Sequence, residues 1–361
     1  MEIGKSLIGV NKIMKIIIVT VFNSQNFGSF WQAKALSEFL EKKGHDVVFL
    51  HSRARSTFKG LLFPYIKASL KSACTFNYRR SIFMLKSLVC IIKNIYSVKI
   101  CFKTKKILNC DAAIFGSDEI WNVTRPEMKN YKIFWGEELD IAKKIAYAPS
   151  INSATASDLI AYGAGKLTNN FAALSVRDLW SKSQLKHLTD REISWVVDPT
   201  LLFDYRYYNK FPTKDINFNY IAIYYFGENR KTVEYINSIA FKLDCKTISI
   251  AQYIEGFDDN VTGLNPFSYY NNASYVITNT FHGTVFAINY MKPFICLAEG
   301  NKKITELLAQ FDLEDRIVDG ESIDEAFCLL SEKSINWDHV GSILQEARDR
   351  SSTFLDKALS E

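Results

Sequence analysis

The amino-acid sequence predicts an α/β protein with two domains, each built on a parallel sheet. Residues 15–22 (KIIIVTVF) form a nearly continuous β-branched and apolar run, which is typical of a parallel strand buried on both faces. A helical pattern of apolar residues follows the loop 23–28 and ends near Gly44, and Asp46–Leu50 predicts a second strand. This order is typical of a Rossmann-like unit, although the loop lacks the G-x-G-x-x-G fingerprint of dinucleotide binding.

Further strand candidates alternate with helical stretches and fall into two series, which a polar connection through Lys214 separates. The first series is 112–115, 144–148, 174–177 and 195–197, and the second is 220–226, 247–250, 275–278 and 294–297. We therefore expect Rossmann-like domains at residues 1–205 and 215–340, with a helix in 341–361 that packs back on the first domain. Ligands bind at the carboxyl ends of parallel strands, so both sheets should face a central cleft.

The composition indicates a globular protein of a reducing compartment. The chain has 361 residues, of which 48% are hydrophobic and 23% charged, so it can bury sizeable cores. Its seven cysteines include no C-x-x-C pair, and their odd number does not suit a disulfide framework or a zinc site: Cys74, Cys90, Cys101, Cys110, Cys245, Cys296 and Cys328. No apolar run reaches the roughly 18 residues of a spanning helix, and no signal peptide is recognisable. We expect a cytoplasmic protein, either free or peripheral at the inner membrane face.

A long basic tract interrupts the first domain. No Asp or Glu occurs between Asp46 and Asp111, whereas Lys and Arg are interleaved with aromatic and aliphatic residues throughout. We expect a helical insertion at about 53–108, and the sequence leaves two main roles open for it. The helices pack on the core with a solvated basic face, or the basic residues 53–106 contact the anionic inner leaflet of a membrane. We do not expect nucleic acid as a partner.

The most informative segment is Tyr275–Tyr290 (YVITNTFHGTVFAINY), which predicts a strand, a tight turn and a helix. His282 is expected in the turn, Gly283 would allow close approach of the backbone, and Thr284 would begin the helix. The free N–H groups of that helix would face an anion such as a phosphate or carboxylate. The anion would favour the imidazolium form of His282, which can donate a proton. A purely structural histidine is the alternative.

Arg177 ends a predicted internal strand. The planar fork of donors on an arginine can clamp a carboxylate or phosphate in this position. A salt bridge to Asp178 or Asp198 is the alternative, and Asp198-Pro199 by itself predicts a capped turn.

Two other segments offer groups for a ligand. Gly28 and Ser29 open a predicted helix and can present backbone and hydroxyl donors, or they serve only as a turn and helix cap. Ser117 and Asp118 follow a predicted strand, and Trp121 and Asn122 come next, so that together they offer polar partners and an aromatic platform for a sugar. Trp121 is equally consistent with a core anchor.

These segments together resemble the polysaccharide pyruvyl transferase family. Residues 279–284 (NTFHGT) resemble its S-F-H-G motif, with Thr280 in place of the serine, and Lys292-Pro293-Phe294 follows as in that family. The other matching segments are Asn26-Phe27-Gly28-Ser29 with Gln32, Asp111–Asn122 for the family's strand and G-S-D-Q-x-W-N, Ser175–Asp178 and Val197–Thr200. Glu119 replaces the usual Gln. The resemblance covers residues 15 to 300 in the correct order.

The resemblance implies a fold similar to the GT-B glycosyltransferase architecture. It also implies a pyruvyl transfer from phosphoenolpyruvate, with no other cofactor, onto a sugar of a bacterial capsule or exopolysaccharide precursor, whether or not that precursor is lipid-linked. The residues show no His, Cys and carboxylate constellation at metal-ligand spacing, so the sequence does not support a metal. His282 and Arg177 are implied as the residues that bind the donor and catalyse, with His282 as the acid that protonates the methylene carbon or assists phosphate departure. Two hydroxyls of the sugar then form a cyclic ketal, with Asp118 and Glu119 as candidate bases. The expected substrate-binding residues are Asn26, Gly28, Ser29, Gln32, Ser117, Asp118, Trp121, Asn122, Asn279, Thr280, Phe281, Gly283 and Thr284.

Two other functions fit the same architecture. A nucleotide-sugar glycosyltransferase would place a diphosphate at the helix N-terminus after His282. A non-catalytic glycan or membrane adaptor would retain only the fold.

Overall fold

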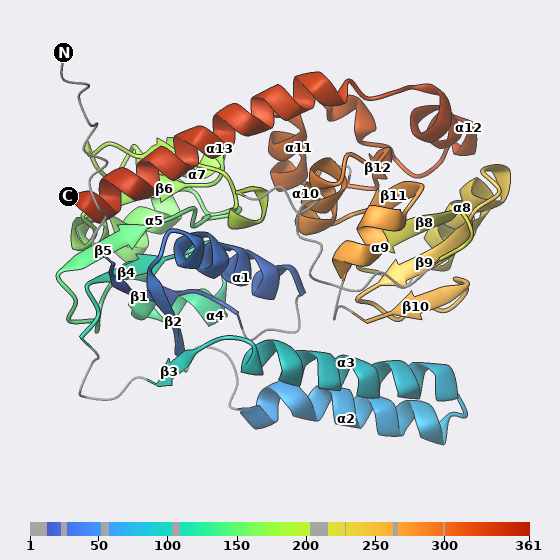
Figure 1. Cartoon of the computed structure of the whole chain (residues 1–361), viewed down its shortest axis with the longest axis horizontal. Coiled ribbons are helices and arrows are strands. Elements are labelled where there is room, and N and C mark those ends of the chain that lie inside the picture. Colours follow the sequence, from blue (N-terminus) through green and yellow to red (C-terminus); the bar gives the residue numbers. More distant parts are fainter. Residues whose placement is uncertain are drawn as a thin grey trace, which may run out of the picture.

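Two parallel sheets form the framework of the protein. The computed structural model describes residues 13–22, 27–51, 58–102, 109–202, 216–227, 229–262, 266–298 and 300–361. Figure 1 shows the two sheets in separate parts of the molecule, with helices packed around each. This arrangement of two Rossmann-like domains confirms the predicted fold class.

The first sheet has seven strands in the order β3-β2-β1-β4-β5-β6-β7, and every pair of neighbours is parallel. The strands are β1 Lys15–Val19, β2 Asp46–His51, β3 Ile100–Phe102, β4 Ala112–Phe115, β5 Lys143–Ala146, β6 Ala173–Val176 and β7 Ser194–Trp195. The central strands β1 and β4 are almost fully buried, which is why their sequences are continuously apolar instead of alternating.

The second sheet has five parallel strands in the order β10-β9-β8-β11-β12. They are β8 Tyr220–Tyr224, β9 Lys246–Ile250, β10 Asp259–Val261, β11 Tyr275–Thr278 and β12 Phe294–Cys296. In both sheets the strand order reverses next to the first strand, so the carboxyl ends of the central strands form a crevice where a ligand can bind.

Helices connect most of the strands. They are α1 Phe27–Lys42, α4 Pro126–Lys129, α5 Ala156–Tyr162, α6 Ala164–Leu167, α7 Leu179–Leu185, α8 Arg230–Lys242, α9 Pro266–Asn272, α10 Phe281–Asn289, α11 Lys302–Ala309 and α12 Ile323–Phe327. Short 3-10 turns occupy Lys132–Trp135, Thr168–Asn170, Pro199–Leu201 and Glu314–Arg316, and a π turn spans Cys328–Glu332. Within the described residues, no helix combines the length and the apolar content that crossing a bilayer would require.

The basic tract forms a helical hairpin between β2 and β3, made of α2 Phe58–Cys74 and α3 Tyr78–Tyr96. Asn77 caps α3 by accepting a hydrogen bond from the Arg80 amide, at 3.0 Å. The hydroxyls of Ser69 and Ser81 lie 2.9 Å apart and join the two helices. Figure 1 shows the hairpin extending alongside the second sheet.

The last helix, α13 Trp337–Ser360, lies across both domains (Figure 1). Its carboxyl-terminal half packs on the first domain, where the Ser351 hydroxyl accepts from the Val197 amide at 3.0 Å and Lys143 donates to the Leu359 carbonyl at 2.8 Å. Leu355 is completely buried in the largest core.

The structure differs from the sequence-based expectations mainly at the ends of elements. β1 ends at Val19 and not at Phe22, and α1 begins at Phe27, one residue before the expected end of the loop. The edge strands β3 and β10 were not expected, because each has only three residues and neither sequence shows a distinct period. The connection at 203–215 lies outside the described residues.

Replacing Leu355 with alanine should lower the free energy of unfolding by about 2–5 kcal/mol, because the substitution leaves a cavity where α13 packs on the first domain. Urea denaturation would measure the change. The matched control is Phe241→Ala, because Phe241 is 90% exposed and its truncation should change stability by no more than about 0.5 kcal/mol. Equal losses in both variants would contradict the buried position of α13.

Candidate functional site

The buried carboxylate of Asp198 is the centre of the candidate site. Its Oδ2 accepts hydrogen bonds from the Ser117 hydroxyl and from Nη1 of Arg177, both at 3.0 Å. Its Oδ1 accepts from the amide and the hydroxyl of Thr200, at 3.0 and 2.6 Å. Burial acts to raise the pKa of Asp198, but His282, Arg177 and the Thr200 hydrogen bonds outweigh it and hold the pKa below its ordinary value. Asp198 is therefore ionised at neutral pH.

Arg177 follows β6 directly and is almost fully buried. Besides its ion pair with Asp198, its guanidinium stacks over the ring of Phe281 at 4.6 Å, across the boundary between the two domains. Burial acts to lower the pKa of Arg177, but Asp198 and Asp118 more than compensate and raise it above its ordinary value. The salt bridge that the sequence left as an alternative is thus present, with Asp198 as the partner.

His282 approaches the same carboxylate from the second domain. Its Nε2 lies 3.9 Å from Oδ1 of Asp198, which is too long for a hydrogen bond, and this buried atom has no hydrogen-bond partner among the described residues. Burial lowers the pKa of His282, and Arg177 acts in the same direction, so that the opposing effect of Asp198 does not restore it. The imidazole is therefore neutral at neutral pH in this ligand-free arrangement.

The start of α10 differs from the expected turn. The helix begins at Phe281, so His282 lies in its first turn, and Thr280 is the N-cap whose hydroxyl accepts from the Gly283 amide at 2.9 Å. A Cβ on Gly283 would lie 2.1 Å from the Thr278 hydroxyl and 2.7 Å from the Thr280 hydroxyl. The packing of the motif itself therefore requires glycine at position 283.

Gly28 packs against the catalytic candidate. A Cβ at this position would lie 2.1 Å from Nδ1 of His282, so only glycine lets α1 come this close to the imidazole. One turn further along α1, Gln32 is fully buried and accepts from the Ser117 amide at 3.1 Å, while its own amide donates to the Ser29 carbonyl at 2.9 Å. These contacts fix α1 to the end of β4.

Asp118 and Glu119 are both held by partners. The Ser29 hydroxyl donates to Asp118 at 2.7 Å, and Glu119 forms an ion pair with Lys303 of the second domain and accepts from Asn152 at 2.9 Å. Burial acts to raise the pKa of each carboxyl group. For Asp118 the effects of Arg177 and of the Ser29 hydrogen bond, with smaller contributions, together outweigh burial; for Glu119 the charge and hydrogen bond of Lys303 and the charge of Arg177 together do. Both pKa values therefore lie below their ordinary values.

A small cavity of about 20 Å³ lies at this meeting point of the two domains. Its lining includes Arg177, Asp198, Phe281 and Lys303. A larger pocket of about 390 Å³ shares Asp178, Lys303 and Glu306 with it and is also lined by Asn152, Ser153, Trp180, Gly300, Asn301 and Lys302. The cavity has room for about one water molecule, whereas the pocket has the size of a small-molecule site.

Several expected binding residues instead have structural contacts. Trp121 is completely buried and stacks on Trp135 at 4.5 Å, so it belongs to the core and cannot be a sugar platform. The side chain of Asn122 accepts from the Thr124 hydroxyl at 2.7 Å, and that of Thr284 donates to the Thr280 carbonyl at 3.0 Å. The side chain of Asn279 accepts a hydrogen bond from the Phe226 amide and donates one to the Phe226 carbonyl, which joins the chain after β8 to the end of β11. Asn26 lies outside the described residues.

The structure gives two further residues a place in the site. The sequence offered Asp198 as a turn cap or as a salt-bridge partner of Arg177, and it is both: Oδ1 caps the 3-10 turn at Pro199, and Oδ2 binds Arg177. Lys303 lies in the first turn of α11, and its sequence neighbourhood carried no signal. Within the described residues, no three His, Cys, Asp or Glu side chains are grouped as a metal site would require.

The two facing Rossmann-like domains define a protein of the GT-B-like class. The fold is similar to that of a putative UDP-N-acetylglucosamine 2-epimerase from Listeria monocytogenes, with a TM-score of 0.50, 9% sequence identity and coverage of 94% of this chain and 91% of the other. It is also similar to Arabidopsis thaliana UGT89C1 complexed with UDP-L-rhamnose, with a TM-score of 0.50, 10% identity and coverage of 97% and 99%. At these identities the likeness shows the fold alone.

Residues 26–301 match the family model "Polysaccharide pyruvyl transferase", and the chain therefore belongs to the polysaccharide pyruvyl transferase family. It is a transferase that moves a pyruvyl group to a polysaccharide acceptor. A comparison with curated proteins found no significant match.

Replacing Gly28 with alanine should destabilise the protein by about 1–3 kcal/mol and reduce turnover, because the new methyl group displaces the His282 ring or α1. Thermal unfolding and an activity assay would measure both effects. Gly341→Ala is the matched control in another helix, where the nearest atom outside that helix lies 3.8 Å away. That variant should gain up to about 1 kcal/mol from helix propensity. Equal stabilisation of both variants would show that Gly28 does not restrain His282.

Proposed function

We propose that the protein transfers pyruvate from phosphoenolpyruvate to two hydroxyls of one sugar in a surface polysaccharide or exopolysaccharide precursor, forming a cyclic ketal. The observation that supports this most is the meeting of Arg177 and His282, from different domains, at the buried Asp198 carboxylate beside a cavity. Phosphoenolpyruvate is a co-substrate, and no further cofactor or metal takes part.

Arg177 and Lys303 bind the anionic groups of the donor. Within the described residues, Asp198 is the hydrogen-bond acceptor of Arg177, so further donors of the guanidinium fork remain for a carboxylate or phosphate. The amides of Gly283 and Thr284 already bind Thr280, which leaves the first amides of α10 to the ligand. Donors held in place before the reaction stabilise charge without reorganisation.

His282 supplies the proton that starts the reaction. Protonation of the methylene carbon forms the methyl group and leaves an oxocarbenium-like centre at the neighbouring carbon, which the first sugar hydroxyl attacks. The proton of this first hydroxyl passes to His282. The bond from this carbon to the phosphate oxygen then breaks, the second hydroxyl attacks, and the second proton leaves with the phosphate. The depressed pKa values of Asp118 and Glu119 make both carboxylates weak bases for these steps.

The acceptor sugar binds in the pocket of about 390 Å³ next to the cavity. The amides of Asn152 and Asn301, the hydroxyl of Ser153 and the indole of Trp180 supply the polar and aromatic contacts that a sugar requires. We place the enzyme in the bacterial cytoplasm or at the inner membrane face, where the precursor of a capsule or exopolysaccharide, including a lipid-linked one, would reach it.

With phosphoenolpyruvate and a suitable glycan, mass spectrometry should detect the gain of one pyruvate as a ketal. His282→Asn should lower kcat by about 10²–10⁴-fold, because the general acid is lost. The control is His339→Asn, because His339 lies on the exposed side of α13 and pairs only with Asp312 among the described residues. Undiminished turnover of His282→Asn, or consumption of a nucleotide sugar in place of phosphoenolpyruvate, would contradict the proposal.

Binding of phosphoenolpyruvate should be accompanied by proton uptake. His282 is neutral in the free protein because its pKa is lowered, and the negative charges of the donor raise that pKa in the complex. Between the two pKa values the affinity should fall as the pH rises. Calorimetry at neutral pH in two buffers of different ionisation enthalpy would count the protons. The uptake should disappear in His282→Asn, and equal uptake by both proteins would assign the proton to another group.

A further inference from the structure

The α2–α3 hairpin exposes an unusual amount of apolar surface. Of the fifteen large hydrophobic side chains that are exposed in the described residues, nine belong to it: Phe63, Ile66, Leu70, Phe76, Tyr78, Ile82, Leu85, Val89 and Tyr96. Single exposed apolar residues are ordinary, but a concentration of them on one supersecondary unit marks an interaction surface.

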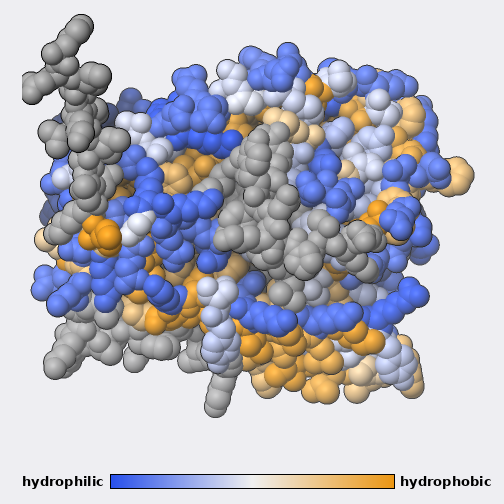
Figure 2. Space-filling model, viewed as in Figure 1, coloured by the Kyte–Doolittle hydropathy of each residue, from blue (hydrophilic) through white to orange (hydrophobic). Residues whose placement is uncertain are grey.

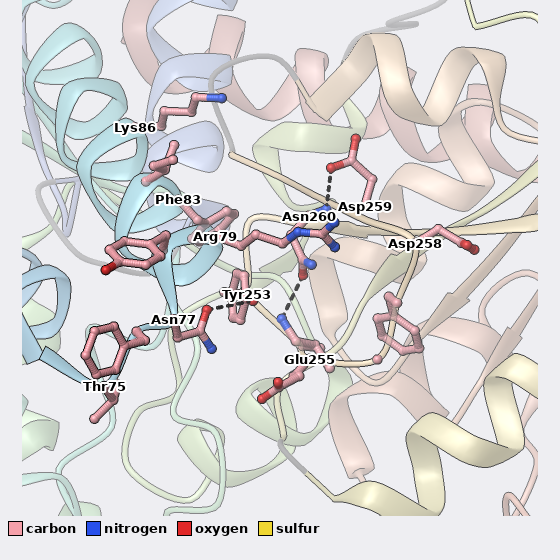
Figure 3. Close-up of a pocket in the computed structure, with 16 residues that line it drawn as sticks. Thr75, Asn77, Arg79, Phe83, Lys86, Tyr253, Glu255, Asp258, Asp259 and Asn260 are labelled. Carbon is pink, nitrogen blue, oxygen red and sulfur yellow. Dashed lines mark hydrogen bonds between the residues drawn. The ribbon is translucent and has the colours of Figure 1, made fainter. Parts of the chain in front are cut away.

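One side of the hairpin is occupied by the second domain. The Tyr253 hydroxyl donates to Asn77 at 3.2 Å, and the Tyr253 ring packs against Phe83 at 5.7 Å and against the Arg80 guanidinium at 5.9 Å. Figure 3 shows Asn77, Phe83 and Tyr253 around a pocket of about 870 Å³ between α3 and the loop before β10. These contacts orient the hairpin relative to the rest of the molecule.

The opposite side, which we name the outer face, has no such contact with the second domain among the described residues. On α2 its residues are Phe63, Ile66, Lys67, Leu70 and Lys71, and on α3 they are Leu85, Val89, Lys93 and Tyr96. They recur at intervals of three and four residues, so each set lies along one side of its helix. Leu70 is 63% exposed and Tyr96 78%. Figure 2 shows hydrophobic atoms gathered over the hairpin, bordered by a hydrophilic row.

The positive charge of the hairpin limits which kinds of partner can bind the outer face. No Asp or Glu occurs between Asp46 and Asp111, so the lysines of the outer face have no carboxylate within the hairpin to offset them. A second copy of the chain would bring two uncompensated positive faces together, which is unfavourable. A nucleic acid would leave the apolar residues in water. Only a surface that combines negative charge with hydrocarbon satisfies both sets of residues.

We propose that the outer face docks on an anionic lipid bilayer. The apolar residues enter the boundary between headgroups and acyl chains, and the lysines bind the lipid phosphates at its surface. A second pocket of about 450 Å³ separates the hairpin from the second domain, with Tyr65, Arg80, Phe226 and Tyr253 in its lining. This pocket lies on the side of the hairpin that faces the second domain, so the hairpin stands between it and the docked bilayer. If the proposed function holds, docking brings the protein to the membrane that carries a lipid-linked acceptor.

Flotation of the full chain with vesicles tests the docking without any need for turnover. We expect binding at low salt to phosphatidylcholine vesicles that contain roughly one-third phosphatidylglycerol, and much weaker binding to pure phosphatidylcholine. Each lysine of the outer face contributes about fivefold to the partition coefficient, so the triple variant Lys67→Gln, Lys71→Gln and Lys93→Gln should lose about a hundredfold. Leu70→Glu with Leu85→Glu should lose more than tenfold while turnover on a water-soluble acceptor stays unchanged.

The matched controls are Lys166→Gln and Phe241→Glu, which make the same kinds of change at exposed positions outside the hairpin and should float like the unaltered protein. Absence of flotation with anionic vesicles, or equal flotation of the outer-face variants and the controls, would overturn the proposal. So would a dimer in solution that Leu70→Glu dissociates, because the outer face would then bind a second copy. Failure of pyruvyl transfer with retained flotation would refute the proposed function and leave the docking intact.

Discussion

The candidate site depends on the ion pair between Asp198 and Arg177. Both side chains are almost fully removed from water, so neither charge is tolerable without the other. The carboxylate also stands next to His282, and the guanidinium stacks on Phe281, so one buried pair from the first domain contacts two consecutive residues of the second. Beside it, Glu119 of the first domain forms another ion pair with Lys303 of the second domain. The buried ion pair of Asp198 and Arg177 therefore holds the two domains in contact and supplies charged groups to the site.

The same pairing constrains the chemistry. When no ligand is bound, the three carboxylates Asp118, Glu119 and Asp198 outnumber the two cations Arg177 and Lys303, so an anionic donor must compete with carboxylates for these cations. The neutral His282 is the one group of this set whose charge can change near neutral pH. Its protonation state can thus follow the charge of the ligand, which suits a residue that must donate a proton only when the donor is present.

The sequence predicted the architecture well because buried parallel strands are continuously apolar, as in β1 and β4, and because a polar connection separated the two series of strands. It also placed Arg177 after a strand and His282 in the following motif of the second domain, and both side chains approach Asp198, although His282 is not among the residues that line the small cavity. The sequence could not show whether Trp121 is a core residue or a sugar platform, because the burial of Trp121 depends on its stacking with Trp135, fourteen residues later. The sequence also could not show that Glu119 pairs with Lys303, since Lys303 comes from the other domain.

The helix α13 determines how the cleft can open. Arg348 donates to the Leu201 carbonyl at 2.7 Å and to Asn289 at 3.0 Å, and Asn289 in turn donates to the Thr200 carbonyl at 2.7 Å. These hydrogen bonds connect the two domains at residues 200 and 201, close to Asp198 in the chain. A ligand larger than the cavity of about 20 Å³ therefore reaches Asp198 through this cavity only if the two domains move apart, which would turn them about α13 and break the Glu119–Lys303 ion pair.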